Sequence, residues 1–140
     1  PILFMKYKLR LAEKKDEQFI KRLHKENSKE IGSFNLFYIW DNYLKRKNKY
    51  IYHIIEDVGF VRHGYSKQKK AYTIKEIAID KNYRGKGYAE ILFNQCKRPM
   101  FLTCNVDNES GNKFYEKMGM KKKKIVVSKN GLKKMNLWVK

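Results

Sequence analysis

The sequence predicts a mixed α/β fold, with a mostly antiparallel central sheet of about seven strands flanked by about four helices. Three patterns indicate this class. Strand-like segments follow one another between residues 50 and 79, and apolar residues recur at helical spacing in several other segments. In addition, one strand passes through a glycine-containing turn directly into a helix. Strands and helices mixed in this way are typical of a sheet covered by helices.

The N-terminal third predicts one strand and two helices. Residues 2–11 alternate loosely between apolar and polar side chains, as a strand does. Residues 12–27 place apolar side chains on one face of an amphipathic helix. From Leu36 to Leu44, apolar residues recur at helical spacing, which predicts a second helix.

Three further strands are predicted over residues 50–56, 58–65 and 72–79. The connections between them are short enough for hairpins, so these strands should form the antiparallel centre of the sheet. His53 and His63 lie on them, and a strand histidine is more often a packed or solvated side chain than a catalyst. Because no second histidine follows at metal-ligand spacing, we expect no metal.

The turn from Asp80 to Ala89 is the most informative stretch of the chain. Gly85 and Gly87 lack a Cβ, so backbone amides there can approach an anion closely. The helix that follows adds unpaired N–H groups, and Arg84 and Lys86 add full charges. We therefore expect a phosphate compound at this turn. The loop types that bind nucleotide triphosphates and dinucleotides are both absent.

The C-terminal third predicts a strand, a helix and a hairpin. Arg98-Pro99 ends the preceding helix, and residues 101–106 read as a strand. Residues 107–110 are a typical helix start, and Gly119 supplies the stop. Residues 125–128 and 132–139 then form a hairpin around Lys129-Asn130-Gly131.

Composition sets the broad class. The 140 residues suffice for one domain, and 42% hydrophobic content predicts a folded globule. The net charge of +19 is spread along the chain, with 17 basic and 8 acidic residues in the first half and 16 and 6 in the second. This charge indicates either an anionic partner such as nucleic acid or a lysine-rich composition without a specific role, and we favour the latter.

The same composition indicates a cytoplasmic protein. No apolar run approaches the length needed to cross a bilayer, and the first residues lack the features of a signal peptide. Cys96 and Cys104 have the spacing neither of a metal site nor of a disulfide framework. We expect a monomer or a homodimer without a membrane partner.

Two motifs at a defined distance carry a family resemblance. Arg84-x-x-Gly87-x-Ala89 follows a strand, and about two dozen residues later comes Asn108-x-x-Gly111-Asn112-x-Phe114-Tyr115-x-x-x-Gly119-Met120. The pair resembles the GNAT superfamily of acetyl-CoA-dependent N-acetyltransferases, densely over residues 75–120 and only in topology elsewhere. The resemblance implies one N-acetyltransferase domain over residues 1–140, acetyl-CoA as the cofactor, and a V-shaped splay between the fourth and fifth strands that holds the pantetheine arm.

The resemblance also implies a set of cofactor-binding residues, drawn from the fourth strand, the glycine turn and the second motif. They are Ile77, Ala78, Ile79, Arg84, Gly85, Lys86, Gly87, Tyr88, Ala89, Asn108, Asn112 and Tyr115. Two departures from the family pattern are the residue Lys81, where proline is common, and an unusually short connection after the helix of residues 85–97. Both bear on the acceptor side more than on the cofactor.

The candidate catalytic residues are Tyr115 and Glu76. Tyr115 stands where the family usually has its general acid, and it would donate a hydrogen bond to the leaving thiolate; otherwise its ring is core. Glu76 is the candidate base that takes the proton of the amine, and if it points away from the cleft it is an ordinary solvated residue.

The acceptor side rests on weaker signals. Phe34, Phe37 and Tyr38 lie where the family lines its acceptor pocket, and otherwise they pack in the core. The four lysines of residues 121–124 are either a solvated connection or a grip on an acidic acceptor or on the nucleotide end of CoA.

The resulting hypothesis is transfer of an acetyl group to a primary amine of a small molecule or protein by direct attack. An amine on RNA, such as that of an aminoacyl-tRNA, is the alternative acceptor. The alternative from another class is a non-catalytic GNAT-like module that binds nucleic acid or protein.

Overall fold

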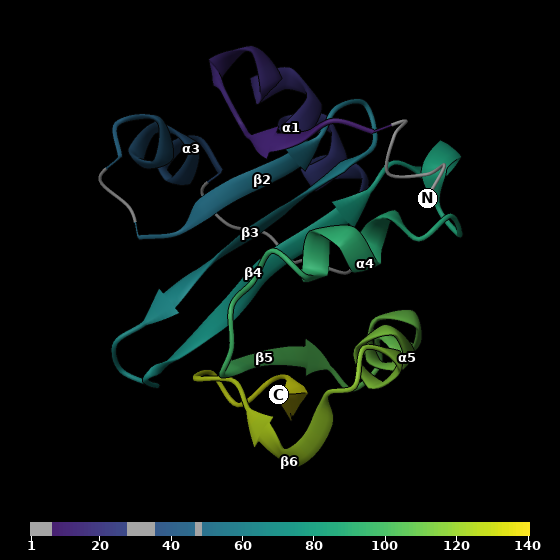
Figure 1. Ribbon diagram of the computed structural model, residues 1–140. Coiled ribbons are helices and arrows are strands. Elements are labelled where there is room, and N and C mark those ends of the chain that lie inside the picture. The colour runs from purple at the N-terminus through teal and green to yellow at the C-terminus, as the bar shows by residue number, and fades with distance from the viewer. Residues whose placement is uncertain (1–6, 28–35, 47–48) are drawn as a thin grey trace.

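The computed structural model describes residues 7–27, 36–46 and 49–140 as one seven-stranded sheet with helices on both faces (Figure 1). The strand order is β1-β2-β3-β4-β5-β7-β6. The strands are β1 (Leu9–Leu11), β2 (Ile51–Ile55), β3 (Gly59–Ser66), β4 (Ala71–Ile79), β5 (Met100–Asn105), β6 (Lys121–Val127) and β7 (Lys134–Val139). Every neighbouring pair is antiparallel except β4 and β5, which are parallel. The predicted fold class is confirmed.

Four α-helices and two 3-10 turns complete the described residues. They are η1 (Lys14–Asp16), α1 (Glu17–Glu26), α3 (Leu36–Leu44), η2 (Lys81–Tyr83), α4 (Tyr88–Phe93) and α5 (Glu109–Lys117). No helix in this part of the chain is both long and apolar enough to cross a membrane. The same residues contain no cluster of three or more histidine, cysteine, aspartate or glutamate side chains that could hold a metal ion.

One apolar cluster joins α1 and α3 to the sheet. Ile20 and Leu23 of α1 and Trp40 of α3 are buried against strand residues such as Tyr52 and Phe60. The rings of Trp40 and Tyr52 meet edge-to-face with centroids 5.3 Å apart, a favourable arrangement for aromatic pairs. The apolar faces predicted for these two helices therefore pack against the sheet.

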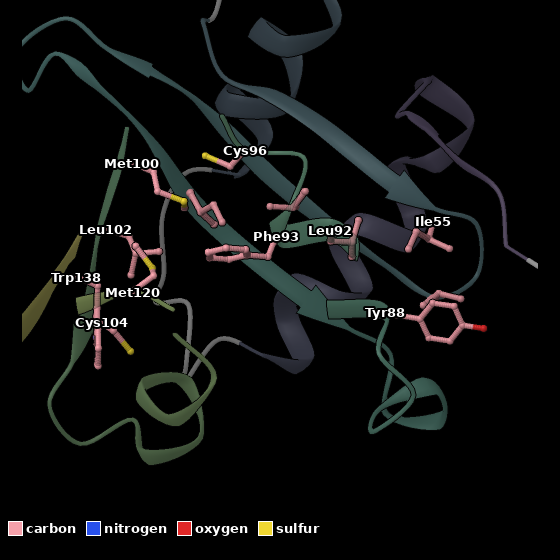
Figure 2. Packing of buried hydrophobic residues seen from close by; sticks show 13 residues of the cluster. Ile55, Tyr88, Leu92, Phe93, Cys96, Met100, Leu102, Cys104, Met120 and Trp138 are labelled. Atoms are coloured by element: carbon pink, nitrogen blue, oxygen red, sulfur yellow. The ribbon is translucent and has the colours of Figure 1, made fainter. Parts of the chain in front are cut away.

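The second apolar cluster covers the other face and continues into the C-terminal strands (Figure 2). Phe93 of α4 lies between Leu92 and Ile55 on one side and Leu102 and Trp138 on the other. This cluster holds the two halves of the sheet together where their strands do not pair.

The two halves diverge between β4 and β5. Only two parallel pairs join these strands, Tyr72 with Met100 and Thr73 with Phe101. Beyond that point β4 continues beside β3 while β5 continues beside β7. The edge of β4 from Ile74 to Ile79 therefore has no strand partner in β5, and this is the predicted V-shaped splay.

Several element bounds differ from the sequence-based expectation. The helix expected over 12–27 begins with the short turn η1, and α4 ends at Phe93 although residues 85–97 were expected to be helical. The expected strand at 2–11 is described from residue 7 onward, and only Leu9–Leu11 form β1; residues 1–6 lie outside the described residues.

The four lysines of residues 121–124 are not a connection, because they form the first half of β6. This strand lies at the edge of the sheet, and all four lysines are exposed. Charged side chains on an edge strand discourage pairing with another chain, which gives the run a structural reason.

Candidate functional site

The glycine turn leaves β4 and enters α4 through two residues with left-handed backbone. Asp80 follows β4, and its carboxylate accepts a hydrogen bond from the Asn82 backbone N–H at 2.9 Å. Gly85 has φ 74° and Gly87 has φ 86°, values that side-chain-bearing residues adopt rarely. The turn is exposed from Arg84 to Gly87, so its backbone faces solvent. These are the features of a surface that an anion can approach.

Two contacts hold this turn against α1. The Arg22 guanidinium lies 2.9 Å from the Asp80 carboxylate, and Arg84 donates a hydrogen bond to the Asn27 side-chain oxygen at 3.0 Å. The Asn82 N–H and the Arg22 guanidinium hold the pKa of Asp80 below its usual range. The turn is thus fixed in place by a helix more than fifty residues earlier in the chain, a link that no local pattern predicts.

The predicted phosphate-binding cations differ in their surroundings. Arg84 also donates to the Ile79 carbonyl oxygen at 3.2 Å, so its guanidinium already serves the turn itself. Lys86 is exposed, with its amine 5.8 Å from the centre of the Tyr83 ring. Lys86 is therefore the more available charge at this turn.

The remaining predicted residues of this region lie along β4 and at the start of α4. Ile77 and Ile79 pack against the cluster under α4, whereas Ala78 is buried on the opposite face. Tyr88 is buried and meets Tyr83 edge-to-face, and Ala89 is half-buried in the same turn of helix. The structure therefore brings the unpaired edge of β4 and the glycine turn together at one end of the V.

The second motif has a clear structural basis. The Asn108 side chain caps α5 by accepting a hydrogen bond from the Gly111 backbone N–H at 2.9 Å. A Cβ at Gly111 would lie 2.6 Å from the Asn108 side-chain nitrogen, so glycine is required beside this cap. The spacing Asn108-x-x-Gly111 is thus explained by helix capping alone.

Asn112 connects three elements. Its side-chain nitrogen donates to the carbonyl oxygens of Asn105 and Asn108, at 2.9 and 2.8 Å. Its side-chain oxygen accepts from Trp138 Nε1 and from the Asn136 side chain, at 2.8 and 3.0 Å. Both Asn108 and Asn112 thus have hydrogen-bond partners within the protein. Their contact with a cofactor stays a prediction.

Tyr115 occupies the face of α5 that points towards α4. Its ring centre lies 6.4 Å from that of Phe93 and 5.5 Å from that of Phe114, and the residue is half-buried. Burial, with the nearby Cys104 thiol, raises the pKa of the Tyr115 hydroxyl. Among the described residues, no hydrogen bond to this hydroxyl is present. The group therefore keeps its proton and is available as a donor.

Glu76 is placed differently from either sequence-based alternative. It is buried on β4, and its two oxygens accept hydrogen bonds from Arg62 Nε at 2.7 Å and Arg62 Nη2 at 3.0 Å. Burial opposes the charge of Arg62, but the hydrogen bond and charge of Glu76 outweigh it and raise the pKa of Arg62. Glu76 is thus neither a solvated strand residue nor an unpaired carboxylate.

Of the three predicted acceptor-side aromatic residues, Tyr38 is the one whose side chain lies within the described part of the structure. Phe34 lies outside the described residues, and Phe37 is within α3, although its side chain is not described. Tyr38 is 63% exposed on the same helix. Its contact with an acceptor stays a prediction.

One open groove, of about 720 Å³, is lined mainly by residues of α5, β6 and β7. Glu109, Lys113 and Glu116 of α5 line it together with Lys121 and Lys122 of β6. Asn112 of the second motif also lines this groove, whereas no residue of β4 or of the glycine turn does.

Comparisons with known proteins agree with this geometry. A family model described as the GNAT acetyltransferase domain matches residues 47–122. No curated protein matches the sequence significantly. A GNAT-family protein from Desulfovibrio desulfuricans has a similar structure, with TM-score 0.77 and 13% identity over 94% of this chain and 96% of that one.

Two further solved structures are similar in fold. Arabidopsis thaliana NAA60 in complex with acetyl-CoA has TM-score 0.75 and 14% identity, covering 96% of this chain and 97% of that one. A variant of the spermidine N-acetyltransferase SpeG from Vibrio cholerae has TM-score 0.72 and 19% identity, covering 94% and 92%. The family match spans more than half of the chain and includes the splayed strands and the glycine turn. The protein belongs to the GNAT family of acetyltransferases.

Proposed function

We propose that this protein transfers an acetyl group from acetyl-CoA to a primary amine of a small molecule or protein. The observation that carries the proposal is the edge of β4 from Ile74 to Ile79, which lacks a partner in β5 and leads directly into the glycine turn. An extended cofactor arm can add to such an edge as a strand would, with its phosphates at the turn. Family membership and the acetyl-CoA complex of NAA60 support the same cofactor.

The residues present fit this cofactor. At Gly85 a Cβ would meet no atom within 4 Å, so the surface beside the turn is open. The backbone N–H groups of the turn and the exposed Lys86 would hold the pyrophosphate, and the backbone of Ile77 and Ile79 would hold the arm. The bound cofactor supplies an activated thioester.

Tyr115 would donate a hydrogen bond from Oη to the sulfur as it leaves. Its raised pKa keeps the hydroxyl protonated at neutral pH, so Tyr115 acts as a fixed donor rather than as a strong acid. The aromatic contacts with Phe93 and Phe114 fix the direction of the ring. Such a donor needs no movement when the thiolate forms.

Removal of the proton from the amine needs an acceptor group. An alkylamine with a pKa near 10.4 is only about one part in 10³ neutral at pH 7, which costs roughly 4–5 kcal/mol without help. Glu76 stays the sequence-based proposal for this base. Its bidentate pair with Arg62 uses one lone pair on each oxygen, so the amine or a bridging water would have to reach a remaining lone pair.

Two measurements test the proposed function. Calorimetry should show acetyl-CoA binding, whereas a non-catalytic module would show none. A screen of amines with acetyl-CoA, followed by mass spectrometry, should then give a product that is heavier than its acceptor by one acetyl group in place of one hydrogen. Absence of acetyl-CoA binding would exclude the proposal.

A further inference from the structure

Three cations surround the ring of Tyr50. The amines of Lys49 and Lys75 lie 5.4 and 5.1 Å from the ring centre, and the Arg62 guanidinium carbon lies 5.5 Å from it. Each of these distances is within the range of cation–π attraction. We call these four residues, Lys49, Tyr50, Arg62 and Lys75, the Tyr50 platform. The proposed acetyl transfer gives no role to Lys49, Tyr50 or Lys75 of this group.

The strands beneath the platform are shaped for it. A Cβ at Gly64 of β3 would lie 2.7 Å from Tyr50 Cδ1, so glycine lets the ring lie directly against the strand. The register between β3 and β4 shifts between Arg62 and His63, which leaves Lys75 as an extra residue in β4. A bulge of this kind redirects a side chain, and here it brings the Lys75 amine over Tyr50.

The platform lies beside the point where the V opens. Thr73 is the last residue of β4 that pairs with β5, and Lys75 follows it by two residues, about 7 Å along a strand. Arg62 and Glu76 are paired across the sheet, and each lies two residues from Phe60 or Ala78 on the same strand, so all four are on the face covered by α1 and α3. The platform is therefore at the inner end of the edge proposed for the cofactor arm, on the face opposite α4.

Within the described residues, one of the three cations of the platform forms an ion pair with a carboxylate. Arg62 pairs with Glu76, but no carboxylate in the described part of the chain forms an ion pair with Lys49 or Lys75. Partial burial of its amine, and then the nearby Arg62, lower the pKa of Lys75. An anion placed between the two lysines would relieve this repulsion, and a polycation would increase it.

We propose that the Tyr50 platform binds a carboxylate of the acceptor, so that the acceptor is an amine whose own molecule carries a carboxylate near the amine. This inference rests on the proposed function and narrows its substrate class. It separates this protein from an enzyme for polyamines, which carry no negative charge. The aromatic ring would contact the carbon skeleton between the two groups, while Lys49 and Lys75 contact the carboxylate.

Matched acceptors test the charge directly. The first pair is alanine and alaninamide, and the second is alanyl-aspartate amide and alanyl-asparagine amide; each pair differs in one carboxylate at nearly equal size. We expect an apparent KM about 10-fold lower for the carboxylate member of at least one pair, and poor transfer to spermidine. A lower KM within the first pair would indicate a free amino acid as the acceptor, and a lower KM within the second pair would indicate an acidic peptide. Equal KM values within both pairs, or preference for spermidine, would overturn the inference.

Two variants connect this preference to the platform. Lys75→Gln and Lys49→Gln should each raise the KM of the carboxylate acceptor about 10-fold without changing that of the neutral acceptor. Lys14→Gln removes an exposed lysine of η1 and should change neither value. Variants that alter both acceptors alike would argue against the platform.

Calorimetry distinguishes failure of this inference from failure of the proposed function. The lysine variants should bind acetyl-CoA as the wild type does, since neither lysine lies in the glycine turn. If the wild type binds no acetyl-CoA, the proposed function fails. If it binds acetyl-CoA but titration with each carboxylate compound gives no heat and no transfer, only the platform inference fails.

Discussion

The two ends of the V are built in different ways. At the cofactor end, the glycine turn and the edge of β4 are continuous in sequence, and the important atoms belong to the backbone. At the proposed acceptor end, the Tyr50 platform gathers side chains from the two residues before β2, from β3 and from the bulge of β4. A backbone site needs residues that permit a conformation, whereas a side-chain site needs a register that brings distant residues together. The first leaves a motif in the sequence and the second does not.

The largest effect is expected at the cofactor end. Gly87→Val should weaken acetyl-CoA binding by about 100-fold or more, because a β-branched residue at φ 86° is strained and its side chain occupies the anion's space. Calorimetry measures the affinity. Gly131→Val provides a matched control, since Gly131 also has positive φ, 72°, but lies in the turn before β7. If both variants bind acetyl-CoA as the wild type does, the assignment of the phosphate turn is wrong.

A large effect on stability is expected at the acceptor end. Arg62→Met leaves Glu76 buried without its partner, and the free energy of unfolding should fall by about 3–5 kcal/mol in urea titrations. The double variant Arg62→Met with Glu76→Leu should recover most of this loss, because no buried charge is left. Such recovery together with retained transfer would assign the pair a structural role. If the double variant recovers its stability but loses acetyl transfer, that result would favour Glu76 as the base.

An intermediate effect is expected between the two ends. Tyr115→Phe keeps the ring contacts with Phe93 and Phe114 and removes only the hydroxyl. The turnover rate should fall by about 10- to 100-fold, with little change in acetyl-CoA affinity or thermal stability. Steady-state kinetics and calorimetry on the same preparations measure both quantities. An unchanged rate would leave Tyr115 as a core residue.

The sequence predicted the fold well because its signals are local. The turn from Asp80 to Ala89 and the capping motif of Asn108 each act within about ten residues, so spacing alone identifies them. The ion pair of Arg62 with Glu76 joins residues 14 apart, and the ties from α1 to the glycine turn span more than fifty. Those contacts depend on how the strands are aligned in the sheet. The hydrophobic pattern does not determine which polar residues this alignment brings together.

The lysine run shows the same limit from the other side. Four consecutive cations carry no apolar alternation, so the sequence indicated a connection where the structure has the edge strand β6. Pairing with β7 from Lys121 to Val127 determines that strand. An edge strand pairs with a neighbour on one side. When both of its faces are solvated, it needs no apolar face, so apolar–polar alternation does not reveal such a strand.

The smallest effect concerns the charge of the whole surface. If +19 reflects lysine-rich composition, added RNA should leave acetyl transfer to a small amine unchanged or slightly inhibited. Any RNA binding should then be sequence-independent and should weaken about 10³-fold or more between roughly 50 and 200 mM salt for six or more phosphate contacts. Replacing the lysines of residues 121–124 by glutamine should reduce that salt dependence without changing the KM of a small amine.

The measurement compares transfer to an aminoacyl-tRNA mixture and to free amines across this salt range. Transfer that requires tRNA and persists at physiological salt would show that the acceptor amine is attached to RNA. The basic surface that binds the RNA would then be part of the acceptor site.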